Sequence, residues 1–564
     1  MEALDWLVSG VFFLALIGII VWVVRQKQND SADYFLGGRD ATWLAIGASI
    51  FASNIGSEHL IGLAGAGASS GMAMAHWEIQ GWMILILGWV FVPFYTRSMV
   101  YTMPEFLERR YNPQSRTILS VISLVSYVLT KVAVTVYAGG LVFQQVFGIK
   151  ELWGIDFFWI AAIGLVVLTA LYTIFGGMKS VLYTSVLQTP ILLLGSLIIL
   201  VLGFKELGGW DEMMRVCGAV TVNDYGDTMT NLIRSNDDAN FPWLGALIGS
   251  AIIGFWYWCT DQFIVQRVLS GKNEMEARRG TIFGAYLKLL PVFLFLIPGM
   301  IAFALHQKYI GAGGEGFLPM LANGTANADA AFPTLVAKLL PAGVKGLVVC
   351  GILAALMSSL ASLFNSSAML FTIDFYKRFR PETPEKKLVG IGQVATVVIV
   401  ILGILWIPIM RSVGDVLYTY LQDVQSVLAP GIAAAFLLGI CWKRTSAQGG
   451  MWGLIAGMVI GLTRLGAKVY YSNAGEVADS TFKYLFYDMN WLFFCGWMFL
   501  FCIIVVIVVS LATKAPTAEK IQGLVFGTAT KEQKAATRAS WNHWDIIHTV
   551  IILAITGAFY WYFW

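Results

Sequence analysis

The chain has 564 residues, of which 58% are hydrophobic and only 13% are charged, and its mean hydropathy is +0.71. Because about a quarter of the residues in soluble domains are charged, this composition excludes a soluble protein and indicates a polytopic membrane protein made of one large bundle. The net charge of +3 is small and spread along the loops, which argues against nucleic acid as a partner.

Apolar segments follow one another along the whole chain, and about 14 of them approach the roughly 20 residues that cross a bilayer. The first lacks the basic start and the small-residue cleavage motif of a secretory signal, so we expect it to stay in the membrane. The predicted spans are 4–25, 43–66, 76–97, 117–146, 155–175, 181–203, 243–269, 280–305, 344–375, 388–410, 415–441, 447–468, 490–512 and 544–563.

Lys and Arg concentrate in alternate loops, from Arg25 and Arg39 after the first span to the basic segment 514–543 before the last. Cytoplasmic loops carry such an excess, so we expect a multi-pass protein of the cell membrane with both termini on the non-cytoplasmic side. The opposite loops 204–242 and 306–343 are polar and could cover an outer vestibule. The compact loops favour a bacterial inner membrane over a eukaryotic plasma membrane.

Segment 51–71 places the polar residues Asn54, Glu58 and His59, together with several glycines, inside the predicted span 43–66. Glycine loosens a helix, and polar side chains are costly at membrane depth. Backbone that leaves the helix there is tolerated only where it lines a cavity or is buried in protein. The pattern predicts a broken helix whose carbonyls and hydroxyls face a ligand, as in secondary transporters. The alternative is a polar kink that packs small residues against a neighbouring helix.

A second interrupted span lies at 243–269, where Gly254 precedes a Trp-Tyr-Trp run and the polar residues Asp261 and Gln262. If the first span is set aside, broken helices begin the first and the sixth of the next ten spans. That position is typical of two inverted five-helix repeats with a binding site between them at the middle of the membrane.

We therefore expect an all-α integral membrane protein of about 14 transmembrane helices, with two inverted five-helix repeats (a LeuT-like core) whose first helices are broken. The whole chain, 1–564, forms one transporter domain. Its predicted parts are an extra N-terminal helix at 4–25, a first repeat at 43–203, a second repeat at 243–441 and extra C-terminal helices within 447–564.

Few ionisable groups lie deep in the predicted spans, and each is a candidate for a functional site. They are Glu78, Lys131, Asp261, Lys288 and Asp423. Three acids and two lysines nearly neutralise one another, so ion pairs with a purely structural role are the alternative. That alternative stays open for Lys131 and Asp261.

Recognition of a sugar needs hydrogen-bonding groups in several directions and an aromatic face. A carboxylate, an amide, an imidazole and an ammonium together suit a polyol, whose hydroxyls both donate and accept. The residues that supply this set are Asn54, His59, Glu78, Lys288 and Gln422. Tyr257 and Trp258 offer faces that stack on the C–H side of a ring. For this aromatic run, helix packing or a place in the interfacial belt is the alternative.

Sodium prefers hard oxygen ligands, and the span 344–375 carries Ser358 and Ser359 in its middle. These hydroxyls could point at the carbonyls of Ala52 and Ile55 in the first broken helix. Serines in membrane helices also bond their own backbone or a neighbouring helix, which is the alternative.

From about residue 35 to 465, the chain resembles the sodium/glucose cotransporter branch of the sodium:solute symporter family. The matching segments run in family order and are Ala52-Ser-Asn-Ile-Gly-Ser57 with His59 and Gly62-Leu-Ala-Gly65, Thr102-Met-Pro-Glu-Phe106, Tyr172-Thr-Ile-Phe-Gly-Gly177, Trp256-Tyr-Trp-Cys-Thr-Asp-Gln262 with Val265-Gln-Arg267, Tyr286-Leu-Lys288, Leu356-Met-Ser-Ser-Leu360 with Phe364-Asn-Ser366 and Leu370-Phe-Thr372, Tyr420-Leu-Gln422 and Trp442-Lys-Arg444.

The resemblance implies ten core helices in two inverted repeats, with one extra helix before them and three after. It favours a functional role over mere pairing for Glu78 and Lys288, and it implies that Tyr257 closes the inner side of the site. The solute contacts that it implies are Asn54, His59, Glu78, Tyr257, Trp258, Lys288 and Gln422. The sodium ligands that it implies are Ala52, Ile55, Ala355, Ser358 and Ser359.

Some positions depart from the family pattern. Ser185 replaces the Asp that family members with a second sodium site share, and Ala361 replaces a hydroxyl just after the serine pair. We therefore expect one co-transported sodium ion per cycle. Gly254 stands where relatives place a polar sugar contact, and Gly81 also offers no side chain to the site. Glucose, galactose and inositol all stay open as substrates.

The sequence thus predicts a sodium-coupled symporter of a monosaccharide, glucose or galactose, that works by alternating access in a lipid bilayer. Alternatives are a sodium symporter of myo-inositol or of another small solute such as an amino acid or a carboxylate, and a sugar-gated sensor without net uptake. An enzyme is not expected, because no nucleophile–base pair or metal cluster is evident in the sequence.

Overall fold

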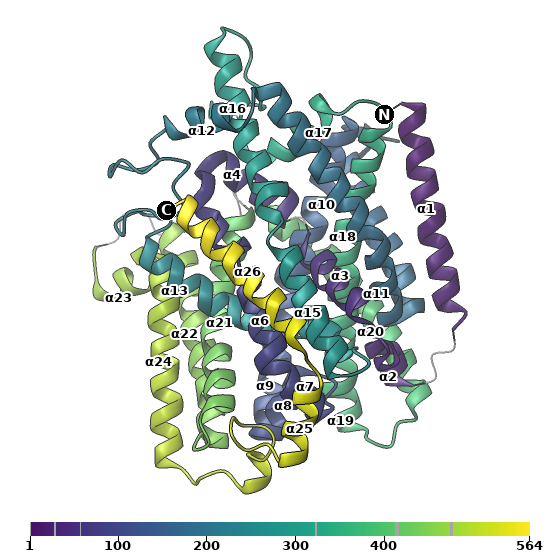
Figure 1. Ribbon diagram of the computed structural model, residues 1–564, viewed down its shortest axis with the longest axis vertical. Helices are drawn as coiled ribbons and strands as arrows, with labels where there is room; N and C mark the ends of the chain where they lie inside the picture. Colours follow the sequence, from purple (N-terminus) through teal and green to yellow (C-terminus); the bar gives the residue numbers. More distant parts are fainter. Residues whose placement is uncertain (1, 27–29, 57, 322–323, 412–416, 474–477) are drawn as a thin grey trace.

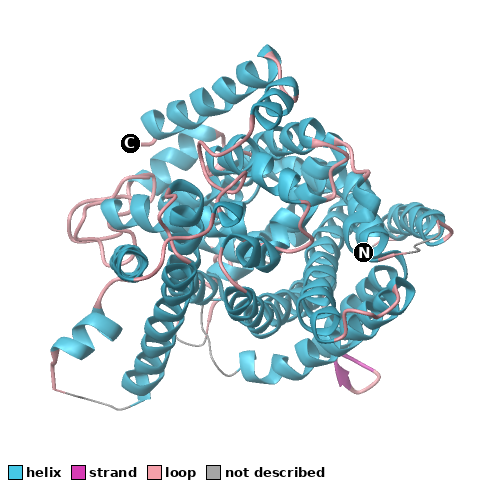
Figure 2. Cartoon of the chain, turned by 90° about the horizontal axis from the view of Figure 1, so that it is seen from below, coloured by secondary structure: helices cyan, strands magenta, loops and turns pink. Residues whose placement is uncertain are grey.

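The computed structural model describes residues 2–26, 30–56, 58–321, 324–411, 417–473 and 478–564, and it forms a bundle of long helices (Figure 1). Seen along the bundle, most helices are viewed end-on, and a small hairpin lies at the periphery (Figure 2). That hairpin consists of β1 (Glu151–Leu152) and β2 (Ile155–Asp156).

The first half of the chain contains one helix outside the core and then the helices around the first break. The elements are α1 (Ala3–Val24), α2 (Ser31–Leu36), η1 (Gly37–Arg39), α3 (Trp43–Asn54), η2 (Glu58–Leu63), α4 (Ala64–Ser70), η3 (Gly71–Met74), α5 (Ala75–Glu78), α6 (Gly81–Ile86), η4 (Leu87–Phe91), α7 (Val92–Ser98), α8 (Met103–Arg110), α9 (Pro113–Ser126), η5 (Tyr127–Val132), α10 (Ala133–Phe147), α11 (Phe157–Leu207) and α12 (Trp210–Gly218).

The second half repeats this order around a second break and adds three long helices at its end. The elements are α13 (Trp243–Gly254), η6 (Phe255–Thr260), α14 (Gln262–Leu269), α15 (Glu274–Lys288), η7 (Val292–Leu296), α16 (Ile297–Gly311), η8 (Ala328–Ala330), α17 (Ala331–Leu339), α18 (Val344–Met369), η9 (Leu370–Tyr376), α19 (Lys377–Phe379), α20 (Glu385–Arg411), α21 (Leu417–Cys441), α22 (Ala447–Asn473), α23 (Thr481–Lys483), η10 (Tyr484–Asp488), α24 (Trp491–Ala512), η11 (Ala518–Lys520), α25 (Lys531–Ala539) and α26 (His543–Tyr562).

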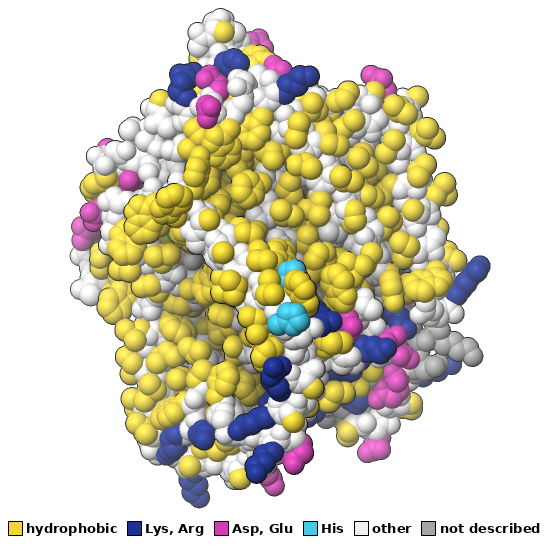
Figure 3. Space-filling view, in the orientation of Figure 1, with side chains coloured by type: hydrophobic (Ala, Val, Ile, Leu, Met, Phe, Trp, Pro, Cys, Tyr) yellow, Lys and Arg dark blue, Asp and Glu magenta, His cyan; other side chains and the backbone are white. Residues whose placement is uncertain are grey.

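The predicted spans all fall on helices in the described part of the chain. Among the described residues, eleven helical stretches are long and apolar enough to cross a membrane. One of them, α11, holds two predicted spans: its 51 residues would extend about 76 Å as a straight helix, over twice the roughly 30 Å hydrocarbon core. Gly177 (φ 52°, ψ −148°) divides α11 into two arms. The chain is a multi-pass membrane protein, and a broad apolar band covers the visible face between charged ends (Figure 3).

Both predicted breaks are present. Helix α3 ends at Asn54, Ile55 is extended (φ −79°, ψ 103°), and helical structure resumes at Glu58. In the second interrupted span, helical structure ends at Thr260, and Asp261 is extended (φ −76°, ψ 127°). The carboxylate of Asp261 then caps α14 by accepting a hydrogen bond from the backbone N–H of Phe263 at 3.2 Å. Each break leaves helix-end groups free to face a cavity.

The segment from 514 to 542, which we call the C-terminal strap, lies against one end of the bundle, and α26 then slants across α6 and α15 (Figure 1). Lys520 Nζ donates to the carbonyl of Glu108 at 2.8 Å, and the N–H of Phe526 donates to the carbonyl of Ile440 at 2.9 Å. Thr537 receives a hydrogen bond from Arg97 at 2.5 Å. The strap thereby contacts the ends of α7, α8 and α21.

Candidate functional site

A cavity of about 60 Å³ lies between the two broken helices, enclosed by side chains of α5, η5, α15, α18 and α21. Its lining residues are Asn54, Glu58, His59, Trp77, Glu78, Gln80, Lys131, Val134, Thr135, Ile253, Gly254, Tyr257, Trp258, Phe263, Lys288, Ser359, Leu363 and Gln425. Pockets that enclose drug-sized ligands measure about 300–1,000 Å³. In this conformation the lining side chains therefore fill most of the space that a solute would need.

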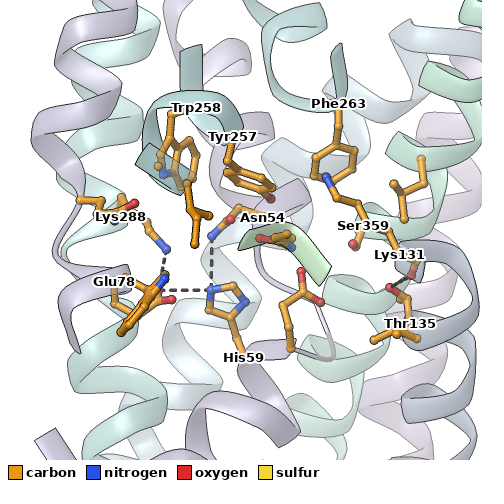
Figure 4. A pocket seen from close by; sticks show the side chains of 18 residues that line it. Asn54, His59, Glu78, Lys131, Thr135, Tyr257, Trp258, Phe263, Lys288 and Ser359 are labelled. Atoms are coloured by element: carbon orange, nitrogen blue, oxygen red, sulfur yellow. Dashed lines mark hydrogen bonds and ion pairs between the residues drawn. The ribbon is translucent and has the colours of Figure 1, made fainter. Parts of the chain in front are cut away.

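The polar side chains of the cavity are bonded to one another around Glu78. Lys288 Nζ lies 2.6 Å from Glu78 Oε2, and His59 Nε2 lies 3.2 Å from the same oxygen (Figure 4). Asn54 Nδ2 lies 3.3 Å from His59 Nε2. All four residues are at most 4% exposed, so the charges of Glu78 and Lys288 depend on each other rather than on water.

His59 retains an unused polar atom at this site. Its Nδ1 is buried and has no hydrogen-bond partner among the described residues. A buried polar atom that lacks a partner costs about 1–3 kcal/mol. A ligand with hydroxyl groups can satisfy this atom and can also bridge the groups that Glu78 now holds together.

Aromatic rings cover one side of the cavity (Figure 4). Tyr257 and Trp258 meet edge to face at 5.0 Å between centroids, and Lys288 Nζ lies 5.3 Å from the centroid of the Trp258 ring. Both rings line the cavity. The position of Trp258 inside the bundle, at 2% exposure, excludes the interfacial-belt alternative for this residue.

Lys131 and Asp261 form the ion pair that the sequence left open, with Lys131 Nζ at 2.6 Å from Asp261 Oδ2. The hydroxyl of Tyr127 also donates to Asp261. Lys131 Nζ further lies 4.8 Å from the ring centroids of both Tyr257 and Phe263. The pair thus links the end of η6 to η5. It has a structural role, and it lies directly beside the cavity.

The space opposite Gly254 is occupied. A Cβ at residue 254 would lie 2.5 Å from Gln80 Oε1 and 3.1 Å from Gln80 Nε2. Gln80 is 3% exposed, lines the cavity and donates to the carbonyl of Ser250 at 2.9 Å. An amide therefore stands at this wall of the cavity, although it comes from the segment after α5 and not from α13.

Gly81 offers no side chain to the site and is not among the residues that line the cavity. A Cβ at Gly81 would meet the carbonyl oxygen of Ala285 at 2.8 Å and Leu289 at 3.2 Å, which places Gly81 against α15. The small residue permits close packing of α6 on α15 rather than space for a solute.

The C-terminal end of α3 packs against the middle of α18. The last four carbonyls of a helix have no partner inside it, and for α3 these include the carbonyl of Ala52, while Ile55 is the extended residue that directly follows the helix. Ser53 Oγ lies 2.6 Å from Ser362 Oγ of α18. A Cβ at Gly56 would lie 3.1 Å from Ser359 Oγ. Helix-end carbonyls and serine hydroxyls are thus brought close together.

The serine pair of α18 is buried, with Ser358 at 1% and Ser359 at 2% exposure, and Ala355 precedes it by one turn at 1%. Ser358 Oγ lies 3.3 Å from Ser185 Oγ of α11, whose hydroxyl also donates to the carbonyl of Val181 at 2.6 Å. Within the described residues, neither Ser358 nor Ser359 hydrogen-bonds a backbone carbonyl. Both hydroxyls are therefore available to a further ligand.

The family model described as "Sodium:solute symporter family" matches residues 34–457. The chain belongs to this family. It is a sodium-coupled solute symporter, and sodium is the ion that it co-transports. The symporter is 36% identical over 542 residues to the mouse sodium/myo-inositol cotransporter 2, a match that covers 94% of this chain and 80% of the mouse protein. It is also 36% identical to the zebrafish sodium/glucose cotransporter 4, over 92% of this chain and 80% of that protein.

Solved structures agree with the fold of the symporter. A sodium-coupled sialic acid symporter in a substrate-bound, outward-open state superposes with a TM-score of 0.72 at 21% identity, over 92% of this chain and 99% of the other. The transporter MhsT in complex with L-phenylalanine gives 0.51 at 13% identity, over 84% of this chain and 99% of the other. These likenesses confirm the core of two inverted five-helix repeats with broken first helices.

The structure brings together every candidate solute ligand of the symporter whose side chain it describes. The side chain of Gln422 lies outside the described residues, although Gln425, one turn further along α21, lines the cavity. The lining residues that sequence reasoning did not assign to the site include two with strongly polar side chains, Glu58 and Gln80. The sequence offered a signal for Glu58, because it is a charged residue within the first break. Gln80 had no signal, because its relevance depends on the missing side chain at Gly254, on a different helix.

Proposed function

We propose that the symporter takes up a small polyhydroxylated ring, a monosaccharide such as glucose or galactose, together with sodium. The observation that carries this proposal is the bonded chain Lys288–Glu78–His59–Asn54 in the wall of a buried cavity. It offers a cation, an anion, an imidazole and an amide within hydrogen-bond reach of one another. Adjacent hydroxyls of a ring can insert between these groups, donating to Glu78 and accepting from Lys288.

The aromatic wall and the amide of Gln80 extend this proposed site. Tyr257 and Trp258 can cover the C–H face of the ring, and Tyr257 closes the inner side of the cavity. We assign Gln422 to the same site on the family resemblance alone. The small volume in this conformation means that the Glu78–Lys288 pair must separate as the solute enters, which makes the pair the first contact that a substrate has to replace.

We propose a sodium site formed by the carbonyls of Ala52, Ile55 and Ala355 and the hydroxyls of Ser358 and Ser359. Its support is the exposure of helix-end carbonyls toward a serine pair that has no backbone partner. Sodium there would hold α3 against α18. Because α3 also carries Asn54, and His59 follows the same break, the ion would position two of the proposed solute contacts.

Glu58 provides a further link between the two proposed sites. The same hypothetical Cβ of Gly56 would lie 2.6 Å from Glu58 Oε2 and 3.1 Å from Ser359 Oγ, so this carboxylate is close to the serine pair. Glu58 also lines the solute cavity and interacts electrostatically with Lys131. A sodium ion beside Glu58 would offset its charge, and a carboxylate that borders both proposed sites is one way in which the two ligands could favour the same state.

We further propose that the end of the bundle that holds the strap is cytoplasmic, with both termini on the other side, in a bacterial inner membrane. The proposed repeats are 43–203 and 243–441, preceded by 4–25 and followed by 447–564. The distribution of Lys and Arg in the loops supports this orientation.

The test is uptake of labelled glucose, galactose and myo-inositol into proteoliposomes with and without an inward sodium gradient. We expect sodium-driven accumulation of a hexose, and loss of that accumulation in the variant Glu78→Gln. With one sodium ion, 100 mV contributes about 2.3 kcal/mol and a tenfold gradient about 1.4 kcal/mol, which limits accumulation to about 500-fold. Accumulation beyond this limit would overturn the one-sodium stoichiometry.

Myo-inositol is a second candidate, because several relatives at about 36% identity are named as sodium/myo-inositol cotransporters. Inositol carries a hydroxyl on every ring carbon, whereas a pyranose has a ring oxygen that only accepts. If unlabelled myo-inositol inhibits uptake more strongly than unlabelled glucose does, myo-inositol would replace the hexose as the proposed substrate. Sodium-dependent currents without accumulated solute would instead indicate a sensor.

A further inference from the structure

A second and larger hollow lies on the outside of the bundle. Its lining is almost entirely apolar, unlike that of the solute cavity. It measures about 950 Å³ and runs between α9, η9 and α20. We call it the α20 groove. Its floor contains the buried residues Ala395 (6% exposed) and Ile399 (5%), and its walls contain the exposed residues Val394 (64%) and Val398 (48%). The groove is therefore a real indentation in the apolar surface.

The groove runs along α20 from Lys387 to Leu402. Fifteen residues of helix extend about 22 Å, compared with about 15 Å for half of a hydrocarbon core. Its long axis thus follows the direction of lipid chains from one interface past the middle of the membrane. Water does not fill an apolar hollow at this depth, so an apolar chain is the occupant that matches its lining.

One end of the groove carries an ammonium group. Lys387 is a lining residue, and its ammonium has no ion pair or hydrogen bond to any described residue. Two cations nearby are engaged: Lys377 Nζ lies 2.8 Å from Glu385 Oε1, and Arg378 donates to Thr117. Lys387 differs from these two, and from the neighbouring Lys386, in that it lines the groove itself and its ammonium is available to a ligand there. Tyr376, with its hydroxyl, lines the same end.

From this placement we propose that the α20 groove binds one anionic phospholipid, with an acyl chain along α20 and the headgroup phosphate at Lys387. Basic positions beside apolar grooves at the cytoplasmic interface suit acidic headgroups. The binding itself does not depend on which solute is carried. The site is distinct from the solute cavity, because the two sets of lining residues do not overlap.

The bound lipid would contact the continuation of the helix that carries the proposed sodium site. Phe371 of η9 lines the groove, and η9 continues α18, which carries Ser358 and Ser359. Leu124 and Val128 line it from the opposite side. A chain wedged between these helices would hold η9 and η5 at a fixed spacing.

The experiment titrates delipidated protein with dioleoyl phosphatidylglycerol or dioleoyl phosphatidylethanolamine and counts bound lipids by native mass spectrometry. We expect one tightly bound phosphatidylglycerol. Lys387→Ala should weaken it about fivefold and Lys387→Glu about thirtyfold, as expected for loss and reversal of one interfacial charge. Val394→Trp, which fills the groove, should abolish it.

Matched controls lie on the same helix. Lys386→Glu changes a neighbouring lysine that does not line the groove, and Val397→Trp enlarges a residue of similar exposure (43%) outside it. Both should keep the lipid. The melting temperature of each variant before lipid addition checks that it is folded, and phosphatidylglycerol should raise it in the wild type but not in Lys387→Glu.

Equal retention of both lipids, or unchanged retention in Lys387→Glu, would overturn the headgroup assignment. If the Val394→Trp variant still retained phosphatidylglycerol, the α20 groove would not be the lipid site. A doubled mass that disappears in Val394→Trp would show that a second copy of the chain covers this face instead.

Discussion

At the scale of single residues, the wall of the cavity opposite α13 shows how one position can replace another. Gly254 has no side chain, and Gln80 reaches across from the segment after α5 into the space that a side chain there would take. The hydrogen-bonding group at this wall is therefore the amide of Gln80, from the segment after α5, rather than a side chain of α13. We therefore expect a substrate at this wall to contact the amide of Gln80.

The exchange between Gly254 and Gln80 can be tested as a double-mutant cycle. Gly254→Asn alone should reduce uptake at least tenfold, because its Cβ would lie 2.5 Å from Gln80 Oε1 in a buried wall. Combining it with Gln80→Ala should restore much of the activity, since the new amide then has room. Uptake kinetics for all four proteins give the coupling energy. Simple addition of the two single effects would contradict direct contact between the residues.

The serine pair of α18 gives a second prediction at this scale. Replacing both Ser358 and Ser359 by Ala removes two hydroxyl ligands from the proposed sodium site, so the sodium concentration for half-maximal uptake should rise at least tenfold. Ser196→Ala, a buried serine of α11 away from that site, is the matched control. Uptake should be measured over a range of sodium concentrations. Unchanged sodium activation in the double variant would count against the site.

These residue assignments were predictable to different degrees. Asn54, His59, Glu78 and Lys288 could be found because polar groups are conspicuous in apolar spans. Gln80 and the packing of Gly81 against α15 could not, because they depend on the rotation of neighbouring helices. Spacing along the chain does not fix that rotation.

At the scale of elements, the short helix η8 packs against α4, the helix that follows the first break. A Cβ at Gly65 of α4 would lie 2.5 Å from Asp329 Oδ1 and 3.2 Å from Asp329 Cα. Nearby, Phe332 of α17 meets Phe295 at 5.6 Å between centroids, and Phe295 lies beside His59. This part of the loop 306–343, which the sequence predicts to be an outer loop, therefore covers the cavity from the side of α4 and η8.

Burial raises the pKa of Asp329 from its ordinary 3.8 to about 6. The packed loop thus favours the neutral carboxyl, whereas an opened loop ionises near pH 4. The packing of η8 on α4 should be strongest below pH 4 and should weaken as the pH rises through about 6. Hydrogen exchange of residues 326–332, corrected for intrinsic rates, should show more protection at pH 5 than at pH 7.5.

The control for this titration is Asp329→Asn, which keeps the shape and removes the charge. Its loop should stay protected at both pH values. A pH dependence that persists in this variant would show that another group is responsible.

Element boundaries show where sequence reasoning ends. The breaks after Asn54 and before Asp261 were predictable, because glycine and polar residues interrupt apolar runs there. The π-helical turns η2, η4, η5, η6, η7 and η9 were not. A π turn adds one residue to a helical turn and changes the face that follows, but it has no compositional signal of its own.

At the scale of the whole molecule, the strap contacts helices of both proposed repeats, 43–203 and 243–441. It contacts Arg97 of α7 in the first repeat, and Thr537 Oγ1 also lies 3.3 Å from Glu274 Oε2 of α15 in the second. Ser540 Oγ donates to Glu274 Oε1 at 3.1 Å. Alternating access moves parts of the core relative to one another, so we expect these contacts to change during the cycle if α7 and α15 belong to different moving parts.

Locking the strap should slow transport without changing solute binding. Cysteines at positions 537 and 274, joined by a short bis-maleimide, should lower the maximal uptake rate at least fivefold while the affinity for solute from outside stays the same. The unlinked double variant and the reagent-treated wild type are the controls. An unchanged rate after complete cross-linking would show that the strap moves with both helices as one body.

The kink in α11 determines how a displacement of this helix would be transmitted to its neighbours. Gly177 joins two membrane-crossing arms with no connecting loop, and its backbone packs against the carbonyl of Tyr34, so the joint has no slack. Beyond it, Ser185 reaches Ser358 of α18, and Thr189 donates to the carbonyl of Ala48 in α3 at 3.2 Å. A rotation of the second arm about Gly177 would therefore displace α18 and α3, the two helices that form the proposed ion site, at the same time.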